Sequence, residues 1–303
     1  EVLEASGLSV LTITNIAVAN DGGGLSTFTL GDVTDADGST LGVVVTDGAA
    51  AATLDVTINS LTVDGGLEVT SNGEDINLDI TEDSSLGGDV AIGDGAGAGV
   101  IAVTAAGLTV DGATAIDATG ADASLTVSGD STFTGGVTLT DGVNASLLAV
   151  NVATDGTDLT VEGDIIGGAA GAGTVSVDDA DATTEDLVTF TGDLGATGAE
   201  LLAVTVGTGT TGGGAQFDGD VLATDVTVGD TGNTGNTFAD FNGDITGNLE
   251  VIASTGTADQ TASANIGGNV TGTITLTDGA GNGAADILFD GTSQTVTGAV
   301  DTS

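Results

Sequence analysis

The stretch Gln216-Phe217-Asp218-Gly219-Asp220-Val221 returns as Asp240-Phe241-Asn242-Gly243-Asp244-Ile245, with its two Phe residues 24 positions apart. Both copies consist of a large apolar residue, a variable residue, Gly, Asp and an aliphatic residue. Looser copies recur at intervals of 23 to 29 residues along most of the chain, starting at Val63, Leu86, Val110, Phe133, Val161, Phe190, Ile266 and Phe289. A period near 25 residues is the sequence signature of stacked structural repeats.

The repeats are built from strand-forming residues. Alternating stretches such as Val137-Thr138-Leu139-Thr140 place aliphatic side chains on one face of a strand and Thr on the other. Leu147–Val152 and Leu201–Val206 are near copies 54 residues apart, which is two repeats. Helices are disfavoured because β-branched residues are frequent and Gly interrupts almost every ten residues. We predict an all-β fold, a parallel β-solenoid of about ten to eleven coils with a period of about 25 residues.

The first part of the chain follows the period poorly. In the stretch from Leu8 to Ile16, apolar residues alternate with Thr and Ser only in places. The sequence therefore divides into an irregular strand-rich segment, residues 1–62, and β-solenoid repeats over residues 63–303. We interpret the first segment as an assembly strand or a cap.

The charge of the chain excludes several classes of partner. Its 303 residues include 45 acidic residues and no Lys, Arg or His, so the formal net charge is −45. Nucleic-acid binding depends on the neutralisation of phosphate, and an anionic membrane surface repels such a chain. No apolar run approaches the roughly 18 residues that a bilayer span requires. We expect neither nucleic-acid binding nor membrane insertion.

Phenylalanine marks the first position of the motif. Five of the seven Phe residues fall there: Phe133, Phe190, Phe217, Phe241 and Phe289. We predict that they point inward and stack with Val161 and Ile266 as a buried ladder, since aromatic side chains dominate packing where few are available. The alternative is an exposed aromatic platform for a sugar or a base.

An acidic residue follows the Gly of the motif in several copies. The candidate metal ligands are Asp89, Asp164, Asp193, Asp220 and Asp244. One interpretation is turn chemistry, because Asp side chains bond to the backbone of their own turn. The other is a row of oxygen ligands for Ca²⁺. Carboxylates one coil apart repel by about 0.9 kcal/mol even in water. Because the chain has no basic residue, only solvent cations relieve that repulsion, and we predict dependence on Ca²⁺ or high salt.

The composition leaves little for catalysis. Without His, Cys, Lys or Tyr, a Ser or Thr nucleophile has no ordinary base. Paired carboxylates can hydrolyse a glycoside, but here the acidic residues are spread over every repeat. We expect no enzymatic activity, and a solenoid glycoside hydrolase is the least favoured of the alternatives.

The Gly-Asp-aliphatic repeats between Val63 and Phe289, with alternating Val/Thr strands between them, resemble repetitive acidic surface proteins of bacteria. These include surface-layer proteins built of β-strand repeats and the β-solenoid stalks of adhesins and autotransporters. The resemblance covers about four-fifths of the chain and lies in the style and period of the repeats. It implies an exported structural protein that often needs calcium.

We therefore expect an extracellular or cell-surface structural protein. The expected partners are copies of itself, joined head to tail into a filament, sheath or surface layer. The alternative function is the passive stalk of an adhesin, and a cell-surface glycan is the second candidate partner.

Overall fold

The computed structural model describes residues 15–20, 26–34, 41–47, 53–93, 99–152, 158–179, 186–207, 211–254, 260–279 and 283–302. Every regular element in these ranges is a β-strand, and the named strands pair in parallel. The described ranges contain no helix that is long and apolar enough to cross a membrane.

The strands form three sheets that run along the stack. Sheet 1 contains β1 (Asn15–Asn20), β4 (Gly42–Asp47), β7 (Leu67–Thr70), β10 (Val90–Ile92), β13 (Thr114–Ala118), β16 (Val137–Asp141) and β19 (Ile165–Gly167). Sheet 2 contains β2 (Ser26–Leu30), β5 (Leu54–Ile58), β8 (Ile76–Ile80), β11 (Ile101–Ala105), β14 (Ala123–Val127), β17 (Ser146–Val152), β20 (Thr174–Asp179), β22 (Leu201–Val206), β24 (Val221–Val228), β26 (Ile245–Ile252), β29 (Ile274–Thr277) and β31 (Val300–Thr302), and β28 (Val270–Thr271) also pairs with β26. Sheet 3 contains β3 (Val33–Thr34), β6 (Leu61–Val63), β9 (Ser84–Leu86), β12 (Leu108–Val110), β15 (Ser131–Phe133), β18 (Leu159–Glu162), β21 (Leu187–Phe190), β23 (Gly213–Phe217), β25 (Thr237–Phe241), β27 (Ala262–Ile266) and β30 (Ala285–Phe289).

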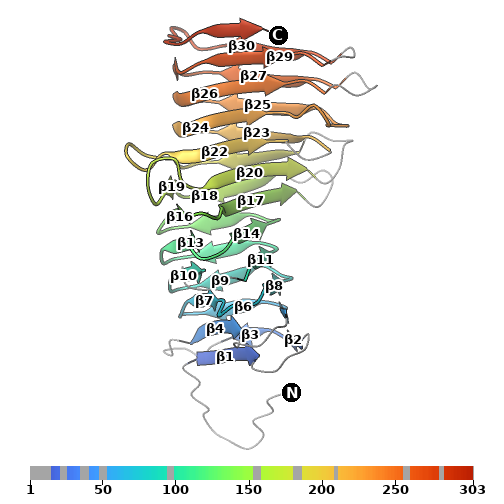
Figure 1. The fold of residues 1–303 in the computed structure, drawn as a ribbon, viewed down its shortest axis with the longest axis vertical. Helices are drawn as coiled ribbons and strands as arrows, with labels where there is room; N and C mark the ends of the chain where they lie inside the picture. The colour runs from blue at the N-terminus through green and yellow to red at the C-terminus, as the bar shows by residue number, and fades with distance from the viewer. Residues whose placement is uncertain are drawn as a thin grey trace, which may run out of the picture.

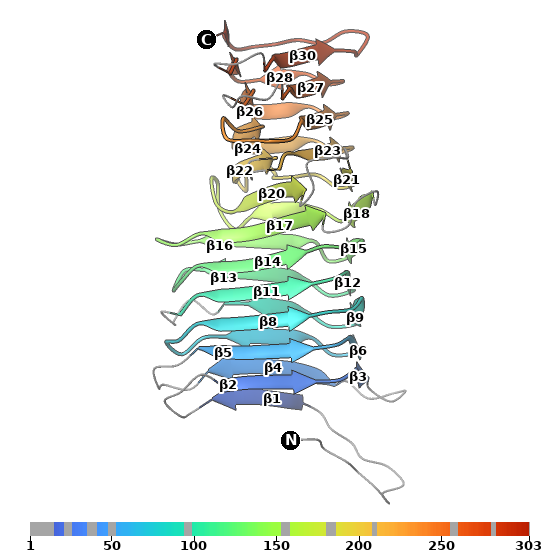
Figure 2. The same cartoon turned by 90° about the vertical axis from the view of Figure 1, so that its right-hand side faces the viewer.

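Each coil from β1 to β21 passes through the three sheets in turn, and later coils pass through sheets 2 and 3. Each new coil pairs above the last, so the strands rise in chain order from β1 to β30 (Figures 1 and 2). The stack has about ten turns with a period near 24 residues, which confirms the predicted parallel β-solenoid. Strands β1, β2 and β3 pair with β4, β5 and β6 in the same three sheets. Residues 1–14 lie outside the described ranges, and a role of residues 1–62 as an assembly strand or cap stays a prediction.

The core is a narrow column of aliphatic side chains enclosed by the three sheets. Strand β8 shows why: Ile76, Leu78 and Ile80 are buried, whereas Asn77 and Asp79 between them are exposed. A strand has a side-chain period of two, so each coil contributes its alternate residues to the core. The next coil covers those residues from above.

Three phenylalanines form the centre of the predicted ladder. The rings of Phe190 and Phe217 stack at 5.3 Å and 11°, and those of Phe217 and Phe241 at 4.9 Å and 12°. Val161 pairs with Phe190 below them, and Ile266 pairs with Phe241 above them. All of these side chains are buried, so the inward ladder is confirmed over this part of the chain.

Phe133 is buried but belongs to a different column. It pairs with Val110, whereas Ser131 is the residue of β15 that pairs with Val161. The pairing register therefore slips by two residues relative to the sequence motif. An even slip keeps every side chain on the same face of the sheet. The prediction that Phe133 stacks with Val161 was wrong, although its inward orientation was right.

The near copies Leu147–Val152 and Leu201–Val206 show the same kind of slip. Leu148 and Val204 both pair with Val175 of the strand between them. Structural equivalence thus spans 56 residues, not the 54 of the sequence match. Leu202, which matches Leu148 in sequence, is 42% exposed.

Phe289 also differs from the prediction. It pairs with Ile266 as the ladder requires, but 41% of it is exposed. The reason is its position in β30, the last strand of sheet 3, with no described strand beyond it. Its prediction as a buried rung was therefore wrong.

Sheets 1 and 2 merge in the C-terminal half. Leu194 bridges Ile165 and Val221, so the line of sheet 1 continues into the first residues of β24. Strands β24 and β26 each span eight residues, and their pairing shifts between Leu222 and Asp225. This bulge bends the outer surface where β24 and β26 pass from one sheet direction to the other.

Candidate functional site

The five predicted metal ligands share one line at the corner between sheet 3 and sheet 1. Each residue on this line accepts, at its carbonyl, the N–H of the first strand residue one coil below: Asp89 accepts from Leu67, and Asp220 from Leu194. We call this line the corner column. It comprises Gly66, Asp89, Ala113, Gly136, Asp164, Asp193, Asp220, Asp244, Asn269 and Thr295.

The structure brings four of the candidates together and leaves one apart. Asp164, Asp193, Asp220 and Asp244 occupy four consecutive coils, which places neighbouring residues about 4.8 Å apart along the stack. Asp89 is separated from them by Ala113 and Gly136. All five side chains are exposed to solvent.

Each carboxylate is held by the coil above it. Oδ1 of Asp164, Asp193 and Asp220 accepts the N–H of the next Asp in the column, at 3.0, 2.9 and 2.8 Å respectively. Asp89 Oδ1 accepts from Ala113 N–H in the same way, at 2.8 Å. The turn-chemistry interpretation expected a bond within the residue's own turn. In the structure the bond instead joins successive coils.

Asn269 continues the column without a charge. Its N–H and its Nδ2 both donate to Asp244 Oδ1, at 2.7 and 3.0 Å. Its own Oδ1 accepts the N–H of Thr295 at 3.0 Å. An Asn therefore keeps the bond to the coil above and adds one to the coil below.

Steric crowding between coils explains why a glycine precedes each Asp of the column. A Cβ on Gly219 would lie 2.5 Å from Asp193 Oδ1 and 2.6 Å from the carbonyl oxygen of Gly192. The corresponding position above Gly219 is Gly243, with equally close neighbours. The Gly-Asp pair of the motif is thus one unit, because the carboxylate of each coil fills the space that a side chain of the next coil would need.

The sequence interpretation missed equivalent residues at the other corners. Asp75 Oδ1 accepts Val100 N–H, Asp122 Oδ1 accepts Ala145 N–H, and Asn236 Oδ1 accepts Thr261 N–H, at 2.9, 2.9 and 3.0 Å. The signal that identifies them is an Asp or Asn directly before a strand. It was hidden because the loops at these corners vary in length.

The corner column is a single file and not a cluster. Among the described residues, no group of three or more acidic side chains lies close enough together to hold a metal ion. Where the column has an Asp, that coil offers a single carboxylate, and one of its oxygens accepts a backbone N–H from the coil above. Binding of Ca²⁺ at Asp89, Asp164, Asp193, Asp220 and Asp244 stays a prediction.

Replacing Asp220 with Asn is expected to raise the free energy of unfolding by about 1 kcal/mol at low ionic strength. The variant keeps the acceptor for Asp244 N–H and removes a charge from between Asp193 and Asp244. Asp220→Ala loses the acceptor and should cost about 1–2 kcal/mol. Asp89→Asn is the matched control with a near-zero effect, since no carboxylate flanks it in the column. Chemical denaturation measures all three, and destabilisation by Asp220→Asn would contradict the account.

Cations are expected to raise the melting temperature, because a charge of −45 opposes the folded state until it is screened. If the column binds Ca²⁺, CaCl₂ should act at far lower ionic strength than NaCl. Asp220→Asn should then lose part of the calcium effect, whereas Asp89→Asn should keep it. Thermal melts in chelator, NaCl and CaCl₂ decide this. Equal melting temperatures for both salts at matched ionic strength would exclude a specific calcium effect.

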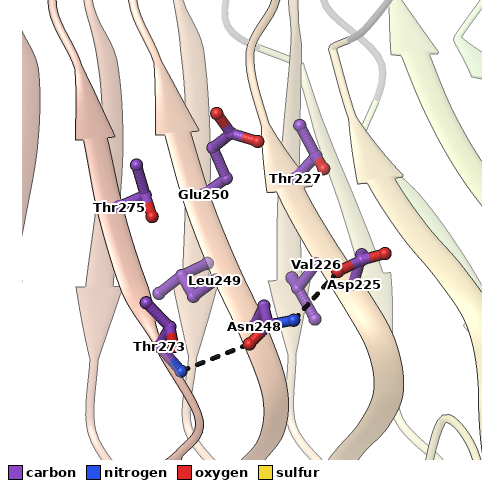
Figure 3. A pocket seen from close by; sticks show the side chains of 8 residues that line it. All are labelled: Asp225, Val226, Thr227, Asn248, Leu249, Glu250, Thr273 and Thr275. Carbon is purple, nitrogen blue, oxygen red and sulfur yellow. Dashed lines mark hydrogen bonds between the residues drawn. The ribbon is translucent and has the colours of Figure 1, made fainter. Parts of the chain in front are cut away.

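A second candidate site is a groove on the outer face of sheet 2 beside the bulge (Figure 3). Its volume is about 490 Å³, and β24, β26 and β29 form its floor. Asn248 Nδ2 donates to Asp225 Oδ1 at 3.2 Å, and Thr273 N–H donates to Asn248 Oδ1 at 3.4 Å. Glu250 and Thr275 project from neighbouring strands (Figure 3). Sequence analysis did not find the groove, because it arises from the bulge.

The groove's chemistry suits a cation or a neutral polyhydroxylated ligand. Its lining presents carboxylates, hydroxyls and one amide, and no basic side chain exists in the chain to meet an anion. An adjoining hollow of about 330 Å³ shares Asn248 and includes Glu200. Backbone N–H groups of Gly198 and of Glu200 itself lower the pKa of the Glu200 carboxyl, which favours its ionised form.

One carboxyl group outside the groove has a raised pKa. Burial raises the pKa of Asp240, and the nearby carboxylates of Asp290 and Asp218 raise it further. Asp218 is itself bound by Gln216 Nε2 at 2.7 Å and Asn242 Nδ2 at 2.9 Å. The two amide groups donate hydrogen bonds to the Asp218 carboxylate. Burial and the two neighbouring carboxylates favour the protonated form of Asp240, because they raise its pKa.

Comparison with protein-family models, with curated proteins and with solved structures found no match. The likeness to bacterial surface proteins therefore rests on the β-solenoid architecture and on the style of the repeats. Function has to be argued from the fold and the chemistry of the surface.

Proposed function

We propose that this protein is an extracellular structural protein that assembles head to tail into a filament, sheath or surface layer. The observation that carries the proposal is the parallel stack of about ten similar turns. Because the named strands pair in parallel, a second copy in the same orientation would extend the same sheets along the axis, and a contact of that kind propagates.

The distribution of charge favours growth along the axis. The sides of the stack carry exposed carboxylates on every face, such as Asp79, Glu68 and Glu162, and like charges keep the sides of two molecules apart. Repulsion between the sides of two molecules therefore favours association along the axis of the stack.

Sedimentation and electron microscopy of the purified chain test the proposal. We expect single-file filaments whose mean length grows with protein concentration and with added salt, because salt screens the repulsion between copies. A monomer at every concentration and salt level would contradict self-assembly. The exported location is tested separately by fractionating the cells that make the protein.

The alternative is the passive stalk of an adhesin, which the unbroken stack of about ten turns also supports. A stalk needs length and stiffness but no self-association. Monomeric rods in the micrographs would favour it. Release of reducing sugar from a glycan panel, abolished by Asp225→Asn in the groove, would instead favour a glycoside hydrolase.

A further inference from the structure

We propose that the groove beside the bulge and the hollow that adjoins it form one binding site for a neutral oligosaccharide. The two share Asn248, and together they cross β24, β26 and β29 on the outer side of the stack. This inference is independent of the proposed self-assembly, because every lining residue lies on the side of the stack.

Glycine keeps the floor of the hollow bare. A Cβ on Gly247 would lie 1.9 Å from the carbonyl oxygen of Ala223, and a Cβ on Gly272 would lie 2.0 Å from that of Gly247. No side chain fits at either position, so a ligand can approach the backbone closely there. Ala170 and Ala223 complete a lining of C–H groups, which suits the apolar face of a sugar ring.

One wall of the hollow is held in place by hydrogen bonds. The carbonyl of Glu200 accepts the N–H of Gly171 at 2.8 Å, and the Glu200 carboxylate accepts the N–H of Gly198 at 2.9 Å. A Cβ on Gly171 would meet only Thr224 Oγ1, 3.7 Å away, so the space between this wall and β24 is open. A site that is formed in advance loses little conformational entropy when it binds a ligand.

The lining offers hydrogen-bonding groups that the protein itself does not use. Within the described part of the chain, no hydrogen bond is made by the Glu250 carboxylate or by the hydroxyls of Thr224, Thr227, Thr246 and Thr275. Figure 3 shows Thr227, Glu250 and Thr275 side by side on the three neighbouring strands, in the register of the sheet. Successive members of this row are about 4.8 Å apart.

A second row is fixed within the protein. Asn248 Nδ2 donates to Asp225 Oδ1, and Asn248 Oδ1 accepts the N–H of Thr273. These bonds set the orientation of the amide and leave Asp225 Oδ2 to accept from a ligand. The groove therefore has two parallel rows of polar groups, one on each side of its long axis (Figure 3).

These groups favour a ligand that carries many hydroxyls. A sugar hydroxyl can donate to Glu250 or Asp225 and accept from a Thr hydroxyl. A cation would use the carboxylates alone and leave the Thr hydroxyls unused, and an anion is repelled by the net charge of −45. The polar rows cross three coils, about 10 Å along the axis, which matches a short oligosaccharide better than a single sugar.

Titration calorimetry of the full chain tests the site. The probes are neutral tetrasaccharides of glucose, xylose, mannose, galactose and N-acetylglucosamine, and the controls are their monosaccharides, tetragalacturonate and CaCl₂. We expect saturable binding of at least one tetrasaccharide, binding of its monosaccharide at least about tenfold weaker, and no binding of the anionic control. Binding of CaCl₂ without binding of any neutral tetrasaccharide would make the groove a cation site and overturn the proposal, as would binding of no probe at all.

The double variant Thr227→Val and Thr275→Val places the sugar in the groove, because it removes two hydroxyls and keeps the shape of the side chains. We expect its affinity to fall at least about tenfold, since two hydrogen bonds are lost. Thr126→Val is the matched control with unchanged affinity: Thr126 lies in the same outward column of sheet 2, outside the groove.

Ala170→Trp should abolish binding, because its ring would fill the hollow. Thermal melts of every variant check that the fold is retained. Parent-like affinity in both the double variant and Ala170→Trp would place the sugar elsewhere and overturn this site. Filament formation is scored on the same samples, so a failure of the sugar site and a failure of self-assembly are seen separately.

Discussion

Replacing Phe217 with Ala is expected to lower the free energy of unfolding by about 3–5 kcal/mol. Phe217 is fully buried and stacks between the rings of Phe190 and Phe241. With only seven Phe residues and no Trp or Tyr in the chain, no other large ring is available to fill the space. The backbone ladders on both sides of β23 prevent the coils from closing onto the cavity, so most of the lost contact is not recovered.

Phe289→Ala is the matched control for that variant. It removes the same atoms from the same column, but from a ring that is 41% exposed. Under conditions that keep the protein monomeric, we expect a loss of no more than about 1 kcal/mol. Chemical denaturation gives the free energies, and hydrogen exchange in β21, β23 and β25 shows whether the opening is local, as is common in stacked repeats. Equal effects of the two variants would contradict the buried ladder.

Much of the fold could be predicted from the sequence, because each coil of a β-solenoid has a similar pattern of strands, turns and buried residues. The spacing of Phe217 and Phe241 predicted the number of residues in one coil, and the alternation of Val and Thr predicted which face is buried. Both signals are local, and both are confirmed. The Gly-Asp pair was recognised as a unit, but its physical cause, a contact between coils, required the structure.

Register could not be predicted in the same way. Phe133 and Val161 occupy the same place in the sequence motif, yet Ser131 is the residue that pairs with Val161. A slip of two residues leaves the same side chains inside, so hydrophobic patterning does not distinguish the two registers. The length of the preceding loop decides between them. The groove at the bulge was unpredictable for the same reason, since the register shift after Leu222 creates it.

Among the candidate ligands, sequence placed all five Asp residues in one column but did not show what holds them. The column position follows from the period. The hydrogen bond that Asp244 N–H donates to Asp220 Oδ1 depends on the height of the next coil and on the absence of a side chain at Gly243. Three-dimensional stacking therefore converts an apparent turn residue into a link between coils. The hydrogen bond from a backbone N–H occupies one oxygen of each carboxylate and is independent of any cation. Calcium binding at these residues therefore remains a separate prediction.

The second large effect is expected for Gly243→Ala, at the glycine that precedes Asp244 of the corner column. A Cβ at position 243 would lie 2.3 Å from the carbonyl oxygen of Gly219 and 2.8 Å from Asp220 Oδ1. Neither atom can retreat, since the first is backbone and the second is bound to Asp244 N–H at 2.8 Å. One methyl group must therefore separate two coils, and we expect a loss of about 3 kcal/mol or more.

Gly31→Ala is the control that isolates this steric effect. A Cβ on Gly31 meets nothing within 4 Å, and its backbone lies outside the left-handed region, as that of Gly243 does. The two substitutions change the unfolded chain equally, so any difference in the free energy of unfolding comes from contact between coils. We expect Gly31→Ala to be neutral or slightly stabilising by denaturation, while amides of β23 and β25 exchange faster in Gly243→Ala. Similar stabilities for both variants would show that successive coils are not held this closely, and the column of carboxylates would then lose its role as a link between them.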